Sequence, residues 1–189
     1  LLGIYEESGQ DVSFGGDLQI IADLLGASDE KSWFGTFLAP RQLIQKNILV
    51  DNSFVSDSWA NSYESINQAN LILDNLDIVT SSDDRRNVIE AETKFLRALN
   101  YFELVRLWGL PYEASTTNNQ PGVPLRLTGY EDYSQPLPAE RASVEEVYAL
   151  ILSDLETAYA NLPVTNTIFA TKYAAQALRA RVYLQMQNY

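Results

Sequence analysis

Two long segments repeat apolar residues with the period of an α-helix, and this pattern limits the fold more than any other feature of the sequence. Between residues 54 and 77 the apolar positions recur every three or four residues, which places them on one face of a helix. Between about 83 and 108 the apolar stripe is wider, as expected for a helix that is covered on two sides. The sequence therefore predicts two long helices that pack against each other and against further elements.

A glycine and a proline end the second of these helices and begin a long loop. Gly109 and Pro111 follow Trp108; glycine accepts a left-handed conformation just after a helix, and proline cannot continue the hydrogen-bond ladder. Residues 109–139 hold five of the seven prolines, which predicts an irregular excursion. Loops of this length often carry function or face a partner.

Two further helices are predicted in the second half of the chain. Ser143 and Glu146 form a capping-box pattern, in which each side chain bonds a backbone N–H at the start of a helix. The apolar stripe that follows runs to Pro163, and a last helix with many small residues is expected from about Thr171. Together with the first two, these segments give two antiparallel helix pairs.

The first fifty residues show a weaker pattern. We expect a short helix that ends near Ser8, a turn at residues 15–16, and a helix at 17–25 or at 40–49. The predicted fold class is all-α, with TPR-like antiparallel helix pairs joined by long irregular loops. We interpret residues 1–189 as a single helical domain that is a fragment of a longer protein.

The composition excludes several classes of function. The 189 residues include 13 basic and 25 acidic side chains, a net charge of −12, which repels the phosphates of nucleic acids and anionic lipid surfaces. Cysteine and histidine are absent, so disulfides, thiolate chemistry, the commonest general base and the commonest metal ligand are all missing. No apolar run reaches the about 18 residues that a membrane-spanning helix needs. We expect no metal, no cofactor and no nucleic acid partner.

Four stretches occur in order and at regular spacing along the chain. They read Trp59-x3-Tyr63-x2-Ile66-x2-Ala69-Asn70; Glu90-Ala91-x3-Phe95-Leu96-Arg97-Ala98-x2-Tyr101-Phe102, ending in Trp108-Gly109-x-Pro111-Tyr112; Gly122-Val123-Pro124-Leu125 with the capped segment 141–163; and Thr171-x2-Ala174-Ala175-x-Ala177-Leu178-x-Ala180-Arg181-Val182-Tyr183-Leu184. Taken together, they cover roughly residues 54–189 and resemble the SusD/RagB family of surface binding proteins. The Trp-Gly-x-Pro-Tyr and Gly-Val-Pro-Leu variants are more similar to the RagB-type branch.

The resemblance implies a mostly helical, cell-surface-exposed lipoprotein of a Bacteroidetes-type outer membrane. Such a protein would bind oligosaccharide or peptide nutrients and deliver them to a SusC-like TonB-dependent transporter, without catalysis. It would meet the membrane only through a lipid anchor outside this segment. The alternative is a generic TPR-like scaffold that binds a protein segment and has no nutrient ligand. A precursor with a signal peptide and a cysteine at the mature start would favour the lipoprotein.

The loop that follows the first helices holds the candidate ligand site. A sugar presents apolar C–H faces and hydroxyl groups, so its site needs an exposed aromatic plane flanked by polar side chains. Trp33, Asp29 and Lys31 supply this combination. In the family a ligand-stacking aromatic can lie in this region, so the resemblance assigns that role to Trp33, with Asp23 and Asp29 as acceptors for hydroxyl groups. The alternative is that Trp33 packs under the loop as an anchor.

The charged residues of the second long helix have a structural and a functional interpretation. Glu90, Glu92 and Glu103 could provide the carboxylates of a glycoside hydrolase. We expect instead that Glu92 and Glu103 are solvated or paired with Arg97 or Arg106, which are neighbours on the helix. An arginine among apolar residues must find partners, so both arginines are expected to clamp neighbouring helix ends or loops, with ligand binding as the alternative. We therefore predict that the chain is not an enzyme.

Overall fold

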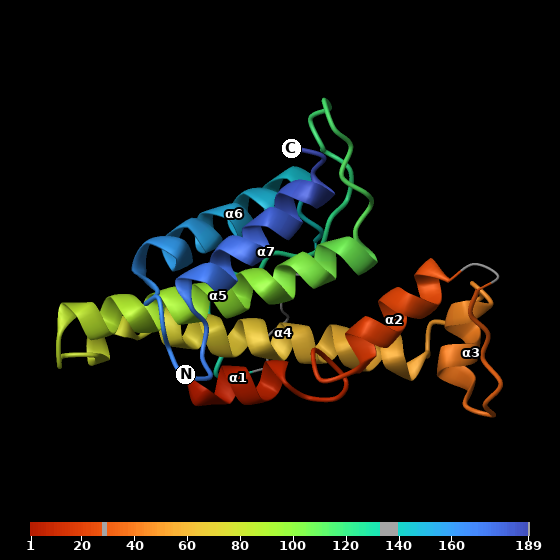
Figure 1. Cartoon of the computed structure of the whole chain (residues 1–189), viewed down its shortest axis with the longest axis horizontal. Helices are drawn as coiled ribbons and strands as arrows, with labels where there is room; N and C mark the ends of the chain where they lie inside the picture. Colours follow the sequence, from red (N-terminus) through yellow and green to blue (C-terminus); the bar gives the residue numbers. More distant parts are fainter. Residues whose placement is uncertain (28–29, 133–139, 189) are drawn as a thin grey trace.

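The computed structural model describes residues 1–27, 30–132 and 140–188, and these parts of the chain are helical, without any strand (Figure 1). The elements are α1 (Leu2–Ser8), α2 (Asp17–Gly26), α3 (Leu38–Ile44), α4 (Ser53–Asp74), the 3-10 helix η1 (Leu76–Ile78), α5 (Asp83–Trp108), α6 (Val144–Asn161) and α7 (Lys172–Gln185). The all-α prediction is confirmed, and the bounds of α5 agree with the expected segment 83–108.

Helix α5 runs through the middle of the molecule (Figure 1). It packs against α4 and α6 and also contacts α1 and α7. The core around it includes Tyr101, Phe102 and Leu104 of α5 together with Ile151 and Leu155 of α6, all of which are fully or almost fully buried. The expectation that this helix is covered on two sides is confirmed.

Side-chain caps fix where the long helices begin. Asn52 accepts a hydrogen bond from a backbone N–H in the first turn of α4, and Ser82 and Thr171 do the same for α5 and α7. At α6 the predicted capping box forms in full: the Ser143 N–H donates to Glu146 Oε2 (2.8 Å), and the Glu146 N–H donates to Ser143 Oγ (3.2 Å). Each cap contributes about 1 kcal/mol to stability.

Gly109 ends α5 in a way that differs from the prediction. Its backbone is extended, with φ −85° and ψ 169°, so the expected left-handed conformation is wrong. A Cβ atom at this position would lie 2.6 Å from the carbonyl oxygen of Val105 and 3.4 Å from the Cα atom of Gly122. Glycine is needed here because a Cβ atom would clash with the last turn of α5, whereas its distance to the returning loop would be an ordinary contact.

The helix predicted at residues 40–49 is shorter and begins earlier, as α3 at Leu38–Ile44. Lys46 adopts a positive φ of 55°, which an α-helix cannot continue through. Its ammonium group donates to the carbonyl oxygens of Leu24 and Leu25 at the end of α2. A contact between α2 and the end of α3 thus ends the helix.

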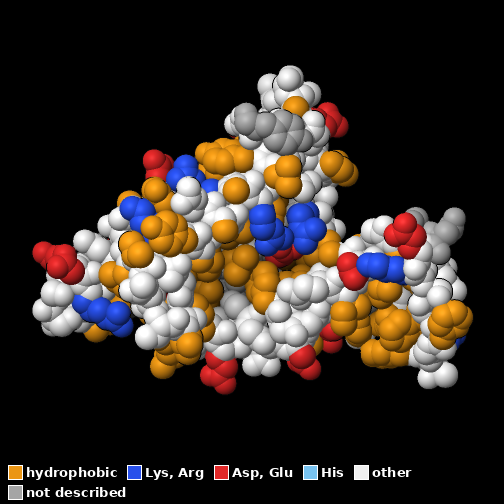
Figure 2. All heavy atoms as spheres, in the orientation of Figure 1, with side chains coloured by type: hydrophobic (Ala, Val, Ile, Leu, Met, Phe, Trp, Pro, Cys, Tyr) orange, Lys and Arg blue, Asp and Glu red, His pale blue; other side chains and the backbone are white. Residues whose placement is uncertain are grey.

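Helices α2 and α3 form a lobe at one end of the molecule (Figure 1). Ile21, Leu24 and Leu43 make its small core. Apolar side chains on the outside of this lobe are exposed, and Figure 2 shows apolar atoms gathered at this end. We call this surface the apolar tip; it comprises Phe34, Phe37, Leu38, Ile48, Leu49 and Val50. None of the described helices is both long and apolar enough to cross a bilayer.

Candidate ligand-binding site

A hollow lies between α2, α5 and α7 on the face shown in Figure 2, where basic side chains gather among apolar atoms. Its volume is about 390 Å³, within the usual range for small-molecule sites. The lining comes from three parts of the chain: Phe14, Leu18, Gln19, Ala22 and Asp23 in and before α2, Leu99, Glu103 and Arg106 on α5, and Arg181 on α7. We call it the arginine pocket.

Glu103 is the buried centre of the pocket's charges. Its side chain is 4% exposed, and it accepts hydrogen bonds from Arg106 Nε (3.1 Å) and Nη2 and from Arg181 Nη2 (3.1 Å). A buried carboxylate is costly unless it is paired; the two guanidinium groups offset that cost, and the bond from Arg181 also joins α7 to α5. The expected pairing of Glu103 with Arg106 is confirmed.

The two arginines keep donors that Glu103 does not use. Arg106 Nη1 and the Nε and Nη1 atoms of Arg181 have no hydrogen-bond partner within the described parts of the chain. The side chains of Arg106 and Arg181 are 27% and 55% exposed, so these donors are accessible from the hollow. Two cations share one buried carboxylate, which leaves this group of three with a net positive charge.

An apolar trough of about 360 Å³ continues from the arginine pocket along α5. It shares Phe14 and Leu99 with the pocket and is further lined by Tyr5, Phe95 and Phe169. The Tyr5 and Phe169 rings lie 5.1 Å apart between their centroids. The continuous surface thus offers apolar contact on one side and charged donors at its end, as small-molecule sites commonly do.

Of the residues predicted to bind ligand, Asp23 and Lys31 come together. Lys31 Nζ lies 2.9 Å from Asp23 Oδ2, and both side chains are well exposed. Asp23 lies in the lining of the arginine pocket, so the ion pair ties the following loop to the pocket's edge. An exposed pair of this kind contributes at most about 1 kcal/mol. Asp29 lies outside the described residues.

Trp33 is only partly exposed, because its indole ring lies against Gly35. A Cβ atom at Gly35 would come within 2.8 Å of the ring, and the indole N–H is buried without a partner in the described structure. The neighbouring Phe34 is 92% exposed. Sequence reasoning missed this second aromatic, although its position directly after Trp33 was a usable signal.

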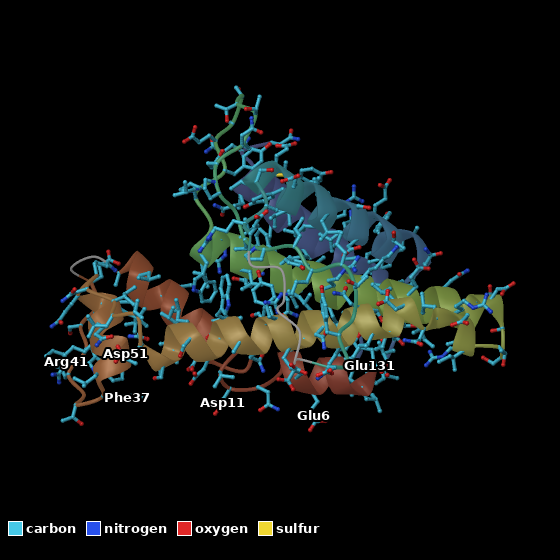
Figure 3. The ribbon with its side chains drawn as sticks, turned by 180° about the vertical axis from the view of Figure 1, so that it is seen from behind. Glu6, Asp11, Phe37, Arg41, Asp51 and Glu131 are labelled. Carbon is cyan, nitrogen blue, oxygen red and sulfur yellow. The ribbon has the colours of Figure 1, made fainter. Side chains whose placement is uncertain are left out.

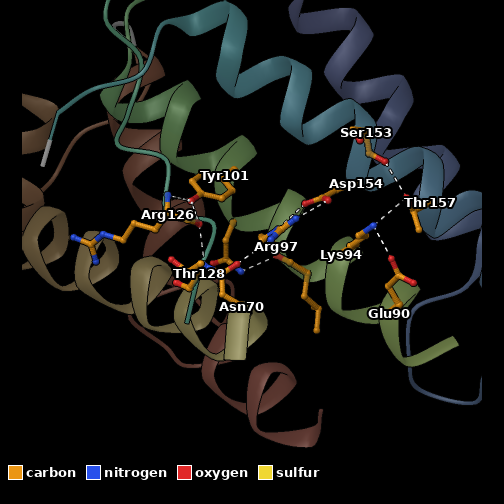
Figure 4. Close-up of polar contacts among 12 residues, drawn as sticks. Asn70, Glu90, Lys94, Arg97, Tyr101, Arg126, Thr128, Ser153, Asp154 and Thr157 are labelled. Carbon is orange, nitrogen blue, oxygen red and sulfur yellow. Dashed lines mark hydrogen bonds and ion pairs between the residues drawn. The ribbon is translucent and has the colours of Figure 1, made fainter. Parts of the chain in front are cut away.

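Arg97 has a structural role, as expected, but its partners are side chains of two neighbouring helices. It donates to both carboxylate oxygens of Asp154 on α6 (2.8 Å each) and to Asn70 Oδ1 on α4 (2.8 Å), as Figure 4 shows. It therefore clamps the faces of three packed helices rather than helix ends or loops. Burial raises the pKa of the Asp154 carboxyl, and the bonds from Arg97 oppose that rise.

The prediction for Glu92 is wrong, because this residue is neither solvated nor paired with an arginine. It is 2% exposed and accepts hydrogen bonds from the Tyr5 hydroxyl (2.9 Å) and from Asn166 Nδ2 (3.1 Å). Burial raises the pKa of the Tyr5 phenol. Glu90 forms an ion pair with Lys94 at 2.7 Å. Within the described residues no group of three acidic side chains is arranged to hold a metal ion.

Comparison with known proteins decides the family. A family model described as "Starch-binding associating with outer membrane" matches residues 27–184. The chain belongs to the SusD-like family. It is 30% identical over 155 residues to a SusD-like protein of Formosa agariphila; the match covers 76% of this chain and 26% of that protein. The chain thus spans about a quarter of the length of the curated relatives it matches.

Solved structures of SusD-like proteins share the fold. A SusD superfamily protein from Bacteroides thetaiotaomicron is 26% identical and superposes with a TM-score of 0.81, covering 98% of this chain and 41% of that one. A laminarin-binding SusD-like protein is 23% identical with a TM-score of 0.71, covering 98% and 40%; at that identity it shows the fold alone. The family resemblance and the TPR-like fold expected from the sequence are confirmed.

Proposed function

We propose that this SusD-like chain captures glycans at the cell surface and passes them to a SusC-like TonB-dependent transporter, without catalysis. A lipid anchor outside residues 1–189 would hold the protein on the outer membrane. The observation that carries the proposal is the match of residues 27–184 to a family described as starch-binding and associated with the outer membrane. The laminarin-binding neighbour supports it, because the same fold serves a glycan-binding protein.

Two features of the chain fit glycan capture. The arginine pocket offers apolar walls beside charged donors, the combination that a sugar's C–H faces and hydroxyl groups need. The loop tied to its edge by Lys31 carries the aromatic residues Trp33 and Phe34. A ring that stacks on a sugar contributes contact area without adding charge, so Trp33 is the proposed stacking residue, whereas Phe34 belongs to the apolar tip.

One feature fits delivery to a partner. The apolar tip exposes several large side chains, among them Phe34 at 92% and Val50 at 103%. Exposed apolar patches on soluble proteins commonly mark interaction surfaces. We therefore assign the apolar tip to contact with the transporter.

Glycan binding is tested on a glycan array, followed by calorimetry with the oligosaccharide that binds best. Trp33→Ala should weaken that affinity about tenfold, equivalent to about 1.4 kcal/mol, with an unchanged melting temperature. Tyr173→Ala is the matched control, because Tyr173 is an exposed aromatic on α7 outside the proposed surface. An array without any bound glycan contradicts the proposal, and equal binding by the Trp33 variant removes its stacking role.

Delivery and the absence of catalysis have separate tests. Cells that lack the protein should lose uptake of the labelled oligosaccharide that the protein binds, and unchanged uptake contradicts delivery. The purified protein should leave that oligosaccharide intact over a long incubation. A steady release of new reducing ends would instead indicate a hydrolase.

A second candidate function is the helical scaffold that binds a protein segment, and the apolar trough along α5 favours it. The trough is lined by Phe95, Leu99 and Phe169, a surface that suits the apolar face of a peptide helix. Ile168→Glu would block such a segment while leaving the arginine pocket and Trp33 in place, because Ile168 is an exposed residue that lines the trough and not the pocket. Loss of a protein partner without loss of glycan binding would support the scaffold.

A further inference from the structure

The arginine pocket carries positive charge although the protein as a whole is acidic. The chain has a net charge of −12, and acidic residues such as Glu6, Asp11 and Asp51 project outward on the face seen in Figure 3. In the pocket the balance is reversed: Arg106 and Arg181 face a single buried carboxylate. A hollow of opposite sign in such a protein attracts anions locally.

We propose that the arginine pocket binds the acidic group of a glycan, either a carboxylate, as in a uronic acid, or a sulfate ester. This inference rests on the proposed glycan capture and names the chemical class of the ligand. The shared chemistry is a small oxyanion on a sugar ring. Planar guanidinium groups bind carboxylate and sulfate oxygens through paired N–H donors.

The unused donors are placed for this role. Glu103 takes the Nε and Nη2 donors of Arg106 and only one donor of Arg181, Nη2 at 3.1 Å. Arg181 Nε and Nη1 and Arg106 Nη1 therefore remain for a ligand. The Arg181 guanidinium also lies 5.4 Å from the centre of the Phe102 ring, a cation–π contact. The Glu103 bond and this ring contact together restrain the Arg181 side chain beside the pocket.

The remaining charge in the lining does not cancel this attraction. Asp23 is a second carboxylate of the pocket, but Lys31 Nζ lies 2.9 Å from it and neutralises it. The full set is three cations and two carboxylates, so one positive charge remains. The cavity of about 390 Å³ has room for one or two sugar rings beside the apolar side chains of Phe14 and Leu18, in line with the usual size of small-molecule sites.

Calorimetry on the purified protein tests the inference with four probes of matched length: an oligogalacturonide, a sulfated galactan oligosaccharide, a neutral galactan oligosaccharide and an acidic peptide. Arg181→Gln should weaken binding of the acidic glycan at least tenfold and weaken binding of the neutral one much less, because a neutral glycan loses one hydrogen-bond donor but no charge attraction. Arg179→Gln, on the same helix but stacked on Tyr159 and Tyr183, should stay within twofold of the wild type. The better of the two acidic glycans identifies the carboxylate or the sulfate as the ligand group.

Glu103→Gln separates anion binding from a purely structural role. This change frees the arginine donors and raises the charge of the pocket by one, so the acidic glycan should bind severalfold more tightly. If the ion pairs only held α5 to α7, the same change would weaken binding or leave it unaltered. Melting temperatures of both variants show whether they are folded.

The outcomes distinguish this inference from the function on which it rests. Binding of neutral glycans with no preference for acidic ones, and no effect of Arg181→Gln, overturns the inference and leaves glycan capture standing. Binding of the acidic peptide alone overturns the assignment to glycans. Failure to bind any glycan contradicts the proposed function itself.

Discussion

Replacing Arg97 by methionine should strongly destabilise the protein, because it removes the only cation that contacts Asp154 among the described hydrogen bonds and ion pairs. The Arg97 and Asp154 side chains are 8% and 3% exposed, and their two bonds of 2.8 Å join α5 to α6 (Figure 4). Breaking a buried pair by deleting one partner costs about 3–5 kcal/mol. At about 2–4 °C per kcal/mol for a chain of this size, the melting temperature should fall by roughly 10 °C.

The loss should depend on pH in a defined direction. Burial raises the pKa of Asp154, and Arg97 opposes the rise; without Arg97 the pKa rises further. When the pKa of a carboxyl group is higher in the folded than in the unfolded state, folding is destabilised as the pH rises above the pKa of the unfolded state. Below that pKa the group is protonated in both states and the loss disappears. The deficit of Arg97→Met should therefore shrink as the pH is lowered.

Two controls accompany this variant. Lys94→Met removes a cation one turn earlier on α5, from an ion pair that is partly exposed, and should cost less than about 1 kcal/mol. The double variant Arg97→Met with Asp154→Leu should recover part of the loss, since apolar residues often replace a buried pair without penalty, while the buried Asn70 Oδ1 still lacks its Arg97 donor. Urea unfolding followed by circular dichroism gives the free energies. A single variant within about 1 kcal/mol of the wild type, or a double variant no better than the single one, would refute the reasoning.

Three further predictions use the same unfolding measurements. Gly109→Ala should lower the free energy of unfolding by about 1–3 kcal/mol, because its Cβ would lie 2.6 Å from a backbone oxygen. Gly26→Ala, with open space around it, should have no effect. Equal effects of the two variants would contradict the clash at Gly109. The hydroxyl and N–H of Ser143 lower the pKa of Glu146 below its ordinary value of 4.5. The cap therefore stabilises the protein fully when the pH is above 4.5, and this contribution is lost as the pH falls through the lowered pKa of the folded state. Glu146→Gln should flatten the melting temperature against pH in that range, and an identical slope would count against the cap. Tyr5→Phe should cost about 1–3 kcal/mol, because a buried carboxylate and a backbone N–H each lose a partner; an unchanged free energy would contradict this.

The long helices were predictable because their signals are local. The apolar period and the residues after Trp108 fixed α5, and the Ser143 and Glu146 pair fixed the start of α6. The end of α3 was not predictable in this way. The chain turns at Lys46, whose ammonium group donates to two carbonyl groups at the end of α2, 22 and 21 residues away. No pattern within the segment reveals such a contact.

The site was predictable only in part, for the same reason. Asp23 lies in the lining of the arginine pocket and Lys31 forms an ion pair with it, a contact that appeared only in the structure, and the role of both in ligand binding stays a prediction. The arginine pocket depends on Arg181 meeting a carboxylate 78 residues earlier, and the partner of Glu92, Tyr5, is 87 residues away. Both contacts form only when segments that are distant in the sequence pack together. The stacking role of Trp33 stays a prediction.

Co-purification from the native outer membrane tests the central proposal most directly. The tagged protein is extracted in mild detergent, and the proteins recovered with it are identified and quantified by mass spectrometry. Capture for import predicts a large TonB-dependent barrel in a stoichiometric amount, which is lost when Phe34 and Val50 of the apolar tip are both replaced by serine. Recovery of the protein without such a barrel, or with a different soluble partner in its place, would contradict it.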